Sequence, residues 1–198
     1  MKGDPKVIEF LNDGLRHELT SINQYWLHYR LLANWGLEKL AKKWRQESIE
    51  EMQHADRLME RMIFLDGMPN MQTLERLHIG RTVKEVIDND LAIEMTARTL
   101  YAEAAGHCLT VQDLVTRDLF QELMRNEERH IDYLETQLDL IARLGIELYS
   151  QHYVSDAEAD IQPNPLRLGE VESLASPRHA CWPSPDWRCA SSSIIPLS

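Results

Sequence analysis

Apolar residues recur every three or four positions along four long stretches of the chain. This spacing is typical of helices that turn one face toward a core. The stretches run from Ile8 to Leu32, Leu40 to Leu65, Val83 to Cys108 and Phe120 to Leu144. Residues that stop or start helices lie between them, namely Gly36, Gly67, Pro69, Thr110 and Asp113. The pattern therefore predicts an all-α domain of four long helices.

The lengths of the connections predict how these helices are arranged. The first and second helices are joined by a few residues, as are the third and fourth, so each pair is antiparallel. A long connection, Asp66 to Arg81, separates the pairs and ends at the capping box Thr82–Glu85. At about 3.3 Å per residue it can run the length of a bundle. We therefore expect a four-helix bundle with one long crossover, in which the second and third helices are parallel.

The composition changes after the fourth helical stretch. Gly145 ends that stretch, and Ile146 to Tyr153 can form one short fifth helix. Residues 154–198 are rich in proline and serine and show no helical periodicity. This composition predicts an irregular or disordered extension. The chain is therefore divided into a helical domain, residues 1–153, and a C-terminal extension, residues 154–198.

Six polar residues interrupt the apolar stripes at positions that face the core. They are Glu18, Glu51, His54, Glu94, Glu127 and His130. Burying a carboxylate without a partner is very costly, so six such groups in one core need a common compensating charge. Metal ions provide that charge, whereas no Lys or Arg lies on the stripes near these residues. Each Glu-x-x-His pair places both side chains on one helix face.

The same residue types repeat at one offset. Glu94 follows Glu18 by 76 residues, and the same offset relates Glu51 to Glu127 and His54 to His130. Four carboxylates nearly balance two divalent cations, and mixed oxygen and imidazole ligands suit iron or manganese. We expect Glu18 and Glu94 to bind one metal each and Glu51 and Glu127 to bridge the pair. His54 and His130 would each bind one metal, as in ferritin-like di-iron bundles.

Two further features of the pattern concern this site. Tyr25 lies on the same face as Glu18 and has Tyr101 as its counterpart at the same offset. It could donate a hydrogen bond to a ligand carboxylate or help to move electrons, or it could be an ordinary core tyrosine.

Glu75 and His78 also have the Glu-x-x-His spacing, but they lie in the crossover and have no counterpart, which indicates a chance match.

Charge and cysteine content exclude several classes of protein. The formal net charge of −11 argues against nucleic acid as the main partner. No apolar run has the length of a membrane helix, and no secretory signal precedes the first stripe. The three cysteines, Cys108, Cys181 and Cys189, give neither a close metal-binding pair nor a disulfide framework. These features favour a cytoplasmic location.

The chain resembles the bacterioferritins over about residues 1–153. The resemblance rests on stretches such as Ile22-Asn23-Gln24-Tyr25, Asn34-Trp35-Gly36-Leu37, His54-Ala55-Asp56 and His130-Ile131-Asp132. It implies a hollow shell of 24 identical subunits, with two iron ions bound in each. It further implies that iron(II) is oxidised there with oxygen or peroxide and stored as mineral. Haem b would lie at each two-fold interface with Met52 as axial ligand, and a ferredoxin-type reductant would support iron release.

Two departures and two alternatives accompany this resemblance. Gln46 and Glu50 stand where bacterioferritins often carry His and Asp, which argues against a secondary iron site facing the cavity, although Glu47 and Glu50 remain acidic. Residues 154–198 also lack the family's usual ending. One alternative is another ferritin-like di-iron oxidase or peroxidase without mineral storage. A rubrerythrin-like protein would add two close cysteine pairs, which this chain lacks. The other alternative, a small DNA-protecting shell protein, would have its metal ligands between subunits and often a basic tail.

Overall fold

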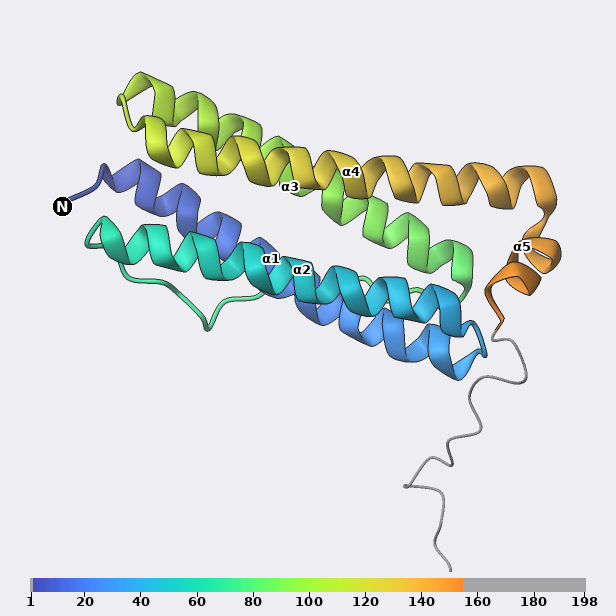
Figure 1. Ribbon diagram of the computed structural model, residues 1–198. Helices are drawn as coiled ribbons and strands as arrows, with labels where there is room; N and C mark the ends of the chain where they lie inside the picture. The colour runs from blue at the N-terminus through green and yellow to red at the C-terminus, as the bar shows by residue number, and fades with distance from the viewer. Residues whose placement is uncertain (1, 155–198) are drawn as a thin grey trace, which may run out of the picture. The chain divides into compact units, whose positions relative to one another are not determined.

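The computed structural model describes residues 2–154 and confirms the all-α prediction. It contains five helices, which are α1 (Pro5–Asn34), α2 (Glu38–Phe64), α3 (Val83–Thr110), α4 (Leu114–Leu144) and α5 (Ile146–Tyr153). Figure 1 shows the four long helices side by side as a bundle, with α5 following the end of α4. Within this part of the chain there are no strands.

The helix ends lie where the sequence places its caps and glycines. The Asp4 side chain accepts the backbone N–H groups of Lys6 and Val7 at 2.9 and 3.1 Å, which satisfies donors that the first turn leaves free. The Thr82 hydroxyl oxygen accepts the N–H of the third residue of α3 at 3.2 Å. After α1 and α4 the chain turns at Gly36 and Gly145, whose φ values of +82° and +77° favour glycine.

The long crossover makes α2 and α3 parallel. In Figure 1 the chain leaves α2 at one end of the bundle and returns along its length before α3 begins. Side chains of α1 accept hydrogen bonds from backbone N–H groups of the crossover along this path. The donor and acceptor pairs are Asn70 with Asn12, Glu75 with Thr20, His78 with Gln24, and Gly80 with His28. The crossover is therefore held against a polar face of α1.

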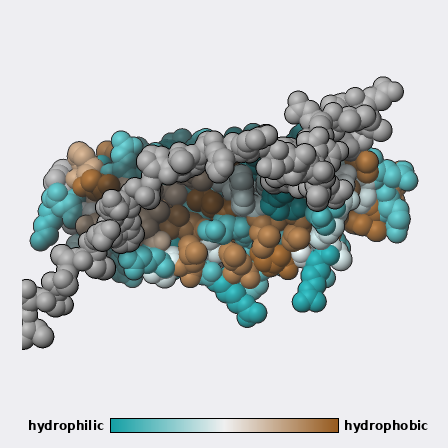
Figure 2. All heavy atoms as spheres, turned by 90° about the horizontal axis from the view of Figure 1, so that it is seen from below, coloured by the Kyte–Doolittle hydropathy of each residue, from teal (hydrophilic) through white to brown (hydrophobic). Residues whose placement is uncertain are grey.

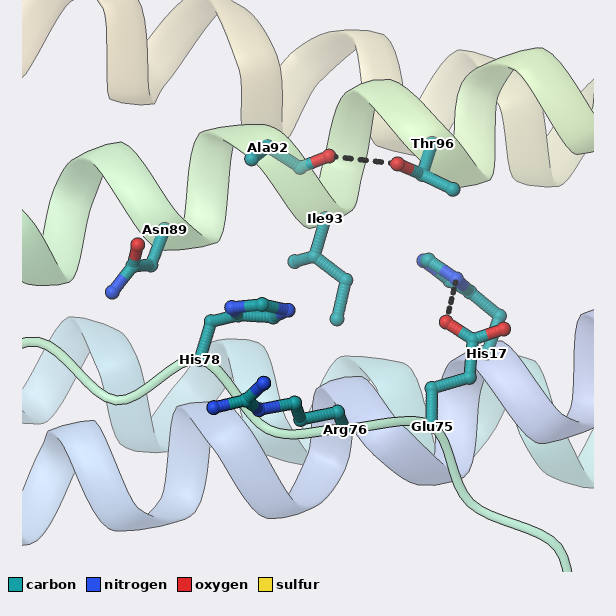
Figure 3. Close-up of a pocket in the computed structure, with 8 residues that line it drawn as sticks. All are labelled: His17, Glu75, Arg76, His78, Asn89, Ala92, Ile93 and Thr96. Carbon is teal, nitrogen blue, oxygen red and sulfur yellow. Dashed lines mark hydrogen bonds and ion pairs between the residues drawn. The ribbon is translucent and has the colours of Figure 1, made fainter.

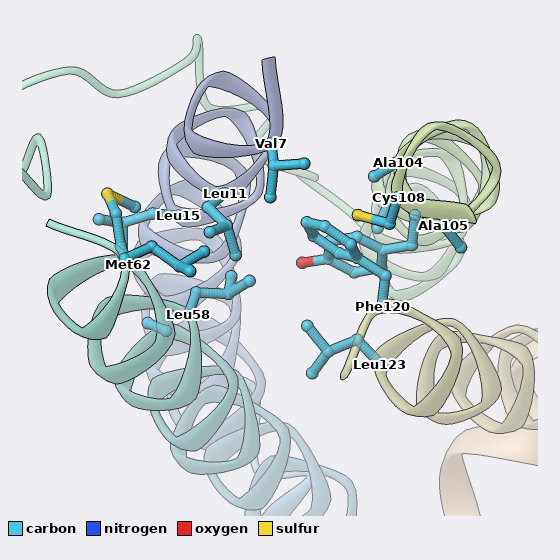
Figure 4. Close-up of a cluster of buried hydrophobic side chains, with 14 residues drawn as sticks. Val7, Leu11, Leu15, Leu58, Met62, Ala104, Ala105, Cys108, Phe120 and Leu123 are labelled. Carbon is cyan, nitrogen blue, oxygen red and sulfur yellow. The ribbon is translucent and has the colours of Figure 1, made fainter. Parts of the chain in front are cut away.

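The core consists of two apolar clusters with the six predicted polar residues between them along the helices. One cluster surrounds Leu11, Leu58 and Phe120 and is drawn in Figure 4. The other is centred on Trp44 and Leu134. On every long helix, the residues of the predicted metal site fall between the positions that belong to the two clusters. The apolar packing therefore fixes the helices on both sides of a polar layer.

Two predictions have different outcomes here. The predicted irregular extension, residues 154–198, lies outside the described residues except for Val154, and the division at residue 153 stays a prediction. The sequence contains no apolar run of membrane length, and the helices of the structure agree with this. Within residues 2–154, no helix is both long enough and apolar enough to cross a membrane.

The contact between the crossover and α3 leads to a testable prediction. A Cβ atom added at Gly80 would lie 2.3 Å from the backbone nitrogen of Val86, so the backbone would have to move. We expect Gly80→Ala to destabilise the protein by about 1–3 kcal/mol, as overpacking typically does. Gly106, inside α3, has no atom within 4 Å of such a Cβ, and Gly106→Ala should stabilise the protein by roughly 0.5–1 kcal/mol. Thermal unfolding of both variants measures this, and equal melting temperatures would contradict it.

Candidate metal centre

The structure brings together all six polar residues that the sequence predicts as metal ligands. Glu18 comes from α1, Glu94 from α3, and the two Glu-x-x-His pairs come from α2 and α4. All six side chains are buried, with exposed fractions between 1% and 6%. Carboxylates this deep inside a bundle require compensating positive charge.

The ligand atoms form two overlapping groups, each with its atoms within 4.8 Å of one another. One group contains Glu18, Glu51, His54 and Glu127, and the other contains Glu51, Glu94, Glu127 and His130. Glu51 and Glu127 belong to both groups, whereas each of the other four residues belongs to one. This is the geometry expected when two carboxylates bridge a pair of metal ions and the remaining ligands each bind a single ion.

Several buried atoms at this centre make no hydrogen bond within the described part of the chain. They are Glu51 Oε1, Glu127 Oε1 and His130 Nδ1, although His130 Nδ1 lies 3.1 Å from Glu51 Oε1. Buried polar atoms without partners are rare in folded proteins because their desolvation is not compensated. A pair of divalent cations bound among these oxygens and nitrogens would satisfy all of them, so the donor set fits a dinuclear metal site.

The proton affinities of these groups reflect their burial. Burial and repulsion between carboxylates raise the pKa of Glu18 and Glu127, and the same causes raise the pKa of Glu51 to about 7. Burial alone would lower the pKa of His130, but the nearby carboxylates of Glu127 and Glu47 favour the protonated ring, outweigh burial and raise the pKa. The metal-free centre therefore retains protons near neutral pH that metal ions would displace.

Two tyrosines support the two carboxylates, Glu18 and Glu94, that each belong to only one of these ligand groups. The Tyr25 hydroxyl donates a hydrogen bond to Glu94, and the Tyr101 hydroxyl donates one to Glu18. Both tyrosines are buried, at 1% and 0% exposure. Each hydrogen bond runs between α1 and α3, and the two are related by the same offset as the ligands. Tyr25 therefore contacts a predicted ligand carboxylate, which is one of the three possibilities that the sequence left open for it.

The buried carboxylate of Asp90 is part of a different arrangement. It accepts hydrogen bonds from Gln24 Nε2 at 2.9 Å and Trp44 Nε1 at 2.6 Å, and both its oxygens lie 2.9 Å from His28 Nδ1. Because His28 Nε2 accepts the N–H of Gly80, the proton of this neutral ring lies on Nδ1. Asp90 thus has enough hydrogen-bond donors without a metal. Through His28, it also connects Gly80 of the crossover to the bundle core.

A third group of possible ligands lies beside the centre. The Nε2 atom of His130 lies 2.9 Å from Glu47 Oε2 and 3.8 Å from Glu50 Oε1, while its Nδ1 faces the dinuclear site. The sequence marks Glu47 and Glu50 as acidic positions but does not predict their grouping with His130, because the group has no counterpart in the other half of the chain. The residues 76 positions after Glu47 and Glu50 are Leu123 and Asn126. Gln46 is exposed and does not belong to it.

Met52, the expected haem ligand, lies on an exposed side of α2 that does not face the centre. Its side chain is 56% exposed, whereas the preceding Glu51 is 1% exposed. A helix turns about 100° per residue, so the two neighbours face in different directions. Met52 is therefore free to contact a group outside this chain.

Comparisons with known proteins agree with this geometry. The family model of the ferritin-like domain matches residues 8–144. Bacterioferritin from Brucella melitensis is 56% identical over 158 residues, which cover 80% of this chain and 98% of the relative. The chain belongs to the bacterioferritin family. Iron storage is the function of this family, and membership assigns that function to the chain.

Solved structures of the family have the same fold. A structure of Rhodobacter capsulatus bacterioferritin, with a metal-free dinuclear site and haem iron in a crystallographic special position, superposes with a TM-score of 0.80. It is 50% identical, and the match covers 81% of this chain and all of that one. Mycobacterium tuberculosis bacterioferritin has a TM-score of 0.77 at 45% identity, covering 78% of this chain and 98% of that one. The bacterioferritin resemblance and the bundle predicted from sequence are both confirmed.

The raised pKa of Glu51 leads to a prediction about the metal-free protein. Between pH 4.5, the ordinary pKa of glutamate, and about pH 7, Glu51 of the folded chain keeps a proton that the unfolded chain has lost. The contribution of Glu51 to the free energy of unfolding therefore declines as the pH rises through this range. Glu51→Gln removes this dependence, and the variant should gain melting temperature relative to wild type from pH 4.5 to 7. Thermal unfolding in chelator tests this, and a difference that is constant or shrinks with pH would contradict it.

Proposed function

We propose that each chain is a ferroxidase subunit, which binds two iron(II) ions as substrate among its six buried carboxylates and imidazoles. The observation that carries this proposal is the pair of overlapping ligand groups that share Glu51 and Glu127. Each iron(II) ion loses one electron, and oxygen or peroxide accepts the electrons of the pair. The product is iron(III), which is stored as mineral.

The chain's contribution is to hold two cations close together and to favour their higher charge. Four buried carboxylates offer four negative charges to two divalent ions, and an additional positive charge on each ion strengthens the attraction in this interior. Glu18 and His54 complete one position, while Glu94 and His130 complete the other. The hydroxyls of Tyr25 and Tyr101 fix one carboxylate at each position, so the ligands need little rearrangement when iron binds.

We also propose that the group formed by Glu47, Glu50 and His130 is a station for iron next to the dinuclear centre. His130 contacts both sets of carboxylates, because its two ring nitrogens face opposite directions. Glu47 Oε2 is buried and makes no hydrogen bond, whereas Glu50 is partly exposed. An ion held here would lie between solvent and the buried ligands.

Storage requires a closed container. We propose that 24 copies of this chain form a hollow shell, as the resemblance to bacterioferritins implies. The surface supports association, because many large apolar side chains are exposed, among them Trp26, Met52 and Ile63. Figure 2 shows hydrophobic residues lying openly between hydrophilic ones on the face that it presents. A ferredoxin-type reductant for iron release belongs to the same proposal.

For haem b, we propose that Met52 provides one axial ligand and that Met52 of a second subunit provides the other. The thioether is exposed on α2 and is not needed for packing this chain, so it fits a shared ligand. The haem iron of the R. capsulatus relative lies in a crystallographic special position, which suits a group shared by two symmetry-related subunits. When bound, the haem would supply a site for electron transfer.

The ferroxidase proposal is tested by a pair of neighbouring substitutions. Glu127→Gln removes a charge that both metal positions share, and initial iron(II) oxidation should slow at least tenfold. Loss of even an outer contact of a metal ligand typically costs 10- to 100-fold. Glu128 is exposed and pairs with Arg98, so Glu128→Gln should oxidise iron at the wild-type rate.

Sedimentation provides the control, because both variants should form the wild-type particle of 24 chains of 23.1 kDa each. Equal oxidation rates in the two variants would sink the assignment. A wild-type particle of only a few chains that still oxidises iron would instead support the alternative of a di-iron oxidase without storage.

The haem proposal is tested by exchanging exposed methionines. Met52→Leu keeps the apolar volume but removes the sulfur ligand, so the absorption spectrum of a bis-methionine haem should disappear after reconstitution. Met95, 49% exposed on α3, offers a matched control, and Met95→Leu should bind haem like the wild type. Iron(II) oxidation should persist in both variants. An unchanged haem spectrum in Met52→Leu would exclude the axial role.

A further inference from the structure

Two of the buried histidines, His54 and His130, belong to groups of possible metal ligands within the described part of the chain. Figure 3 shows another buried histidine, His17, beside Glu75 of the crossover and outside these groups. The Nδ1 atoms of His54 and His130 lie 2.7 and 3.1 Å from oxygens of Glu51. Their Nε2 atoms therefore face away from the centre, and the neighbours of these outer nitrogens influence how each ring can bind a metal.

The outer nitrogen of His130 faces carboxylates. Its Nε2 atom lies 2.9 Å from Glu47 Oε2 and 3.8 Å from Glu50 Oε1. Carboxylate oxygens are acceptors only, so they favour a proton on the nitrogen that they face. While no ion occupies the station beside it, His130 thus has its proton on Nε2 and can offer Nδ1 to a metal ion. This is the arrangement that ligating histidines usually have.

The outer nitrogen of His54 faces an amide instead. Its Nε2 atom lies 3.0 Å from the side-chain nitrogen of Asn126, and the Asn126 side-chain oxygen accepts a hydrogen bond from Arg129 at 2.6 Å. Because arginine has no acceptor atom, its partner has to be the amide oxygen, and the NH₂ group then faces His54. His54 Nε2 is therefore the acceptor, and the ring proton lies on Nδ1, directed at Glu51.

The sequence accounts for this difference between the two halves of the chain. Asn126 follows Glu50 by 76 residues, so an amide in the second half stands where the first half has a carboxylate. The residue 76 positions after Glu47 is Leu123, which is buried in an apolar cluster. Neither acidic neighbour of the His130 ring is therefore repeated beside His54.

A metal ion bound by His54 requires the opposite arrangement of hydrogen-bond donors. The ion takes the place of the proton on Nδ1, and a neutral ligating ring then carries its proton on Nε2. This N–H and the NH₂ group of Asn126 would be two donors facing each other. The amide has to turn over to present its oxygen, which breaks its hydrogen bond with Arg129. The Arg129 side chain is 66% exposed, so water can take over its hydrogen bonds.

We propose that Asn126 is a positioning residue that makes the two iron positions unequal. The position that includes His130 fills at a lower metal concentration, because its ring already has the required arrangement. The position that includes His54 fills only when the Asn126 amide turns over and Arg129 moves away. This inference rests on the dinuclear site of the proposed function, but it does not depend on the oxidation chemistry.

Anomalous diffraction from crystals of the full chain, soaked at increasing Zn²⁺ concentration, tests the inequality without a redox step. The His130 position should fill at a Zn²⁺ concentration about tenfold lower than the His54 position, which is the usual size of effect for groups that orient a metal ligand. When both positions are filled, the Arg129 guanidinium should lie beyond hydrogen-bond distance of Asn126. Wild-type positions that fill at the same concentration would overturn the proposal.

Two variants should make the His54 position easier to fill. Asn126→Asp offers the His54 N–H an acceptor in either orientation, and Arg129→Leu leaves the amide free to turn over. Each should lower the Zn²⁺ concentration that fills this position about tenfold. Damage to the fold would weaken binding and cannot produce this gain. Arg125→Leu is the matched control, because Arg125 is exposed one turn earlier on α4 and has the same charge, and it should fill like the wild type.

The variants also separate this inference from the proposed function. A wild-type order of filling in both Asn126→Asp and Arg129→Leu would contradict the role of the amide. An equal gain in Arg125→Leu would contradict it as well, by showing that loss of a positive charge is sufficient. Absence of zinc from both positions would contradict the dinuclear site itself, and this inference with it.

Discussion

The cost of burying four carboxylates and two imidazoles in one layer of the bundle determines most of this structure. Such groups destabilise an interior unless each is paired. The chain pairs some of them internally, through the tyrosine hydroxyls and the contacts of His130, but leaves oxygens of Glu51 and Glu127 without hydrogen bonds. Two metal ions bound here would satisfy these atoms and also neutralise the charge. In the proposed function, iron binding would therefore complete the core as well as begin storage.

The rest of the fold keeps this layer in register. Apolar clusters on either side fix the four helices, and the crossover makes the two Glu-x-x-His helices approach from opposite directions. The site is nearly symmetric, but its surroundings are not. Asp90, with its donors Gln24, His28 and Trp44, has Gly14 as its counterpart in the first half of the chain. Near Asp90 a buried polar network connects the core to Gly80 of the crossover, whereas near Gly14 the side chains of Leu58 and Tyr101 pack closely around a glycine.

The ligand set was accessible to sequence analysis because helices impose a strict spacing. Polar residues on an apolar stripe, repeated at one offset, leave few explanations other than a metal, and the length of the crossover decides the topology. Thr20, Gln24 and His28 were not recognised, because their partners are backbone N–H groups of an irregular segment that has no periodicity. Glu47 and Glu50 were identified as acidic positions, but their grouping with His130 was not predicted for a related reason. This grouping depends on neighbours in three dimensions, and it has no counterpart in the other half of the chain.

The central claim is that one chain holds two iron ions through two shared carboxylates. Anomalous diffraction at the iron edge, from crystals loaded with iron(II) without oxygen, measures this directly. The account predicts two iron peaks per subunit, with Glu51 and Glu127 each in contact with both and His54 and His130 each in contact with one. A single peak, or two peaks that share neither carboxylate, would contradict it.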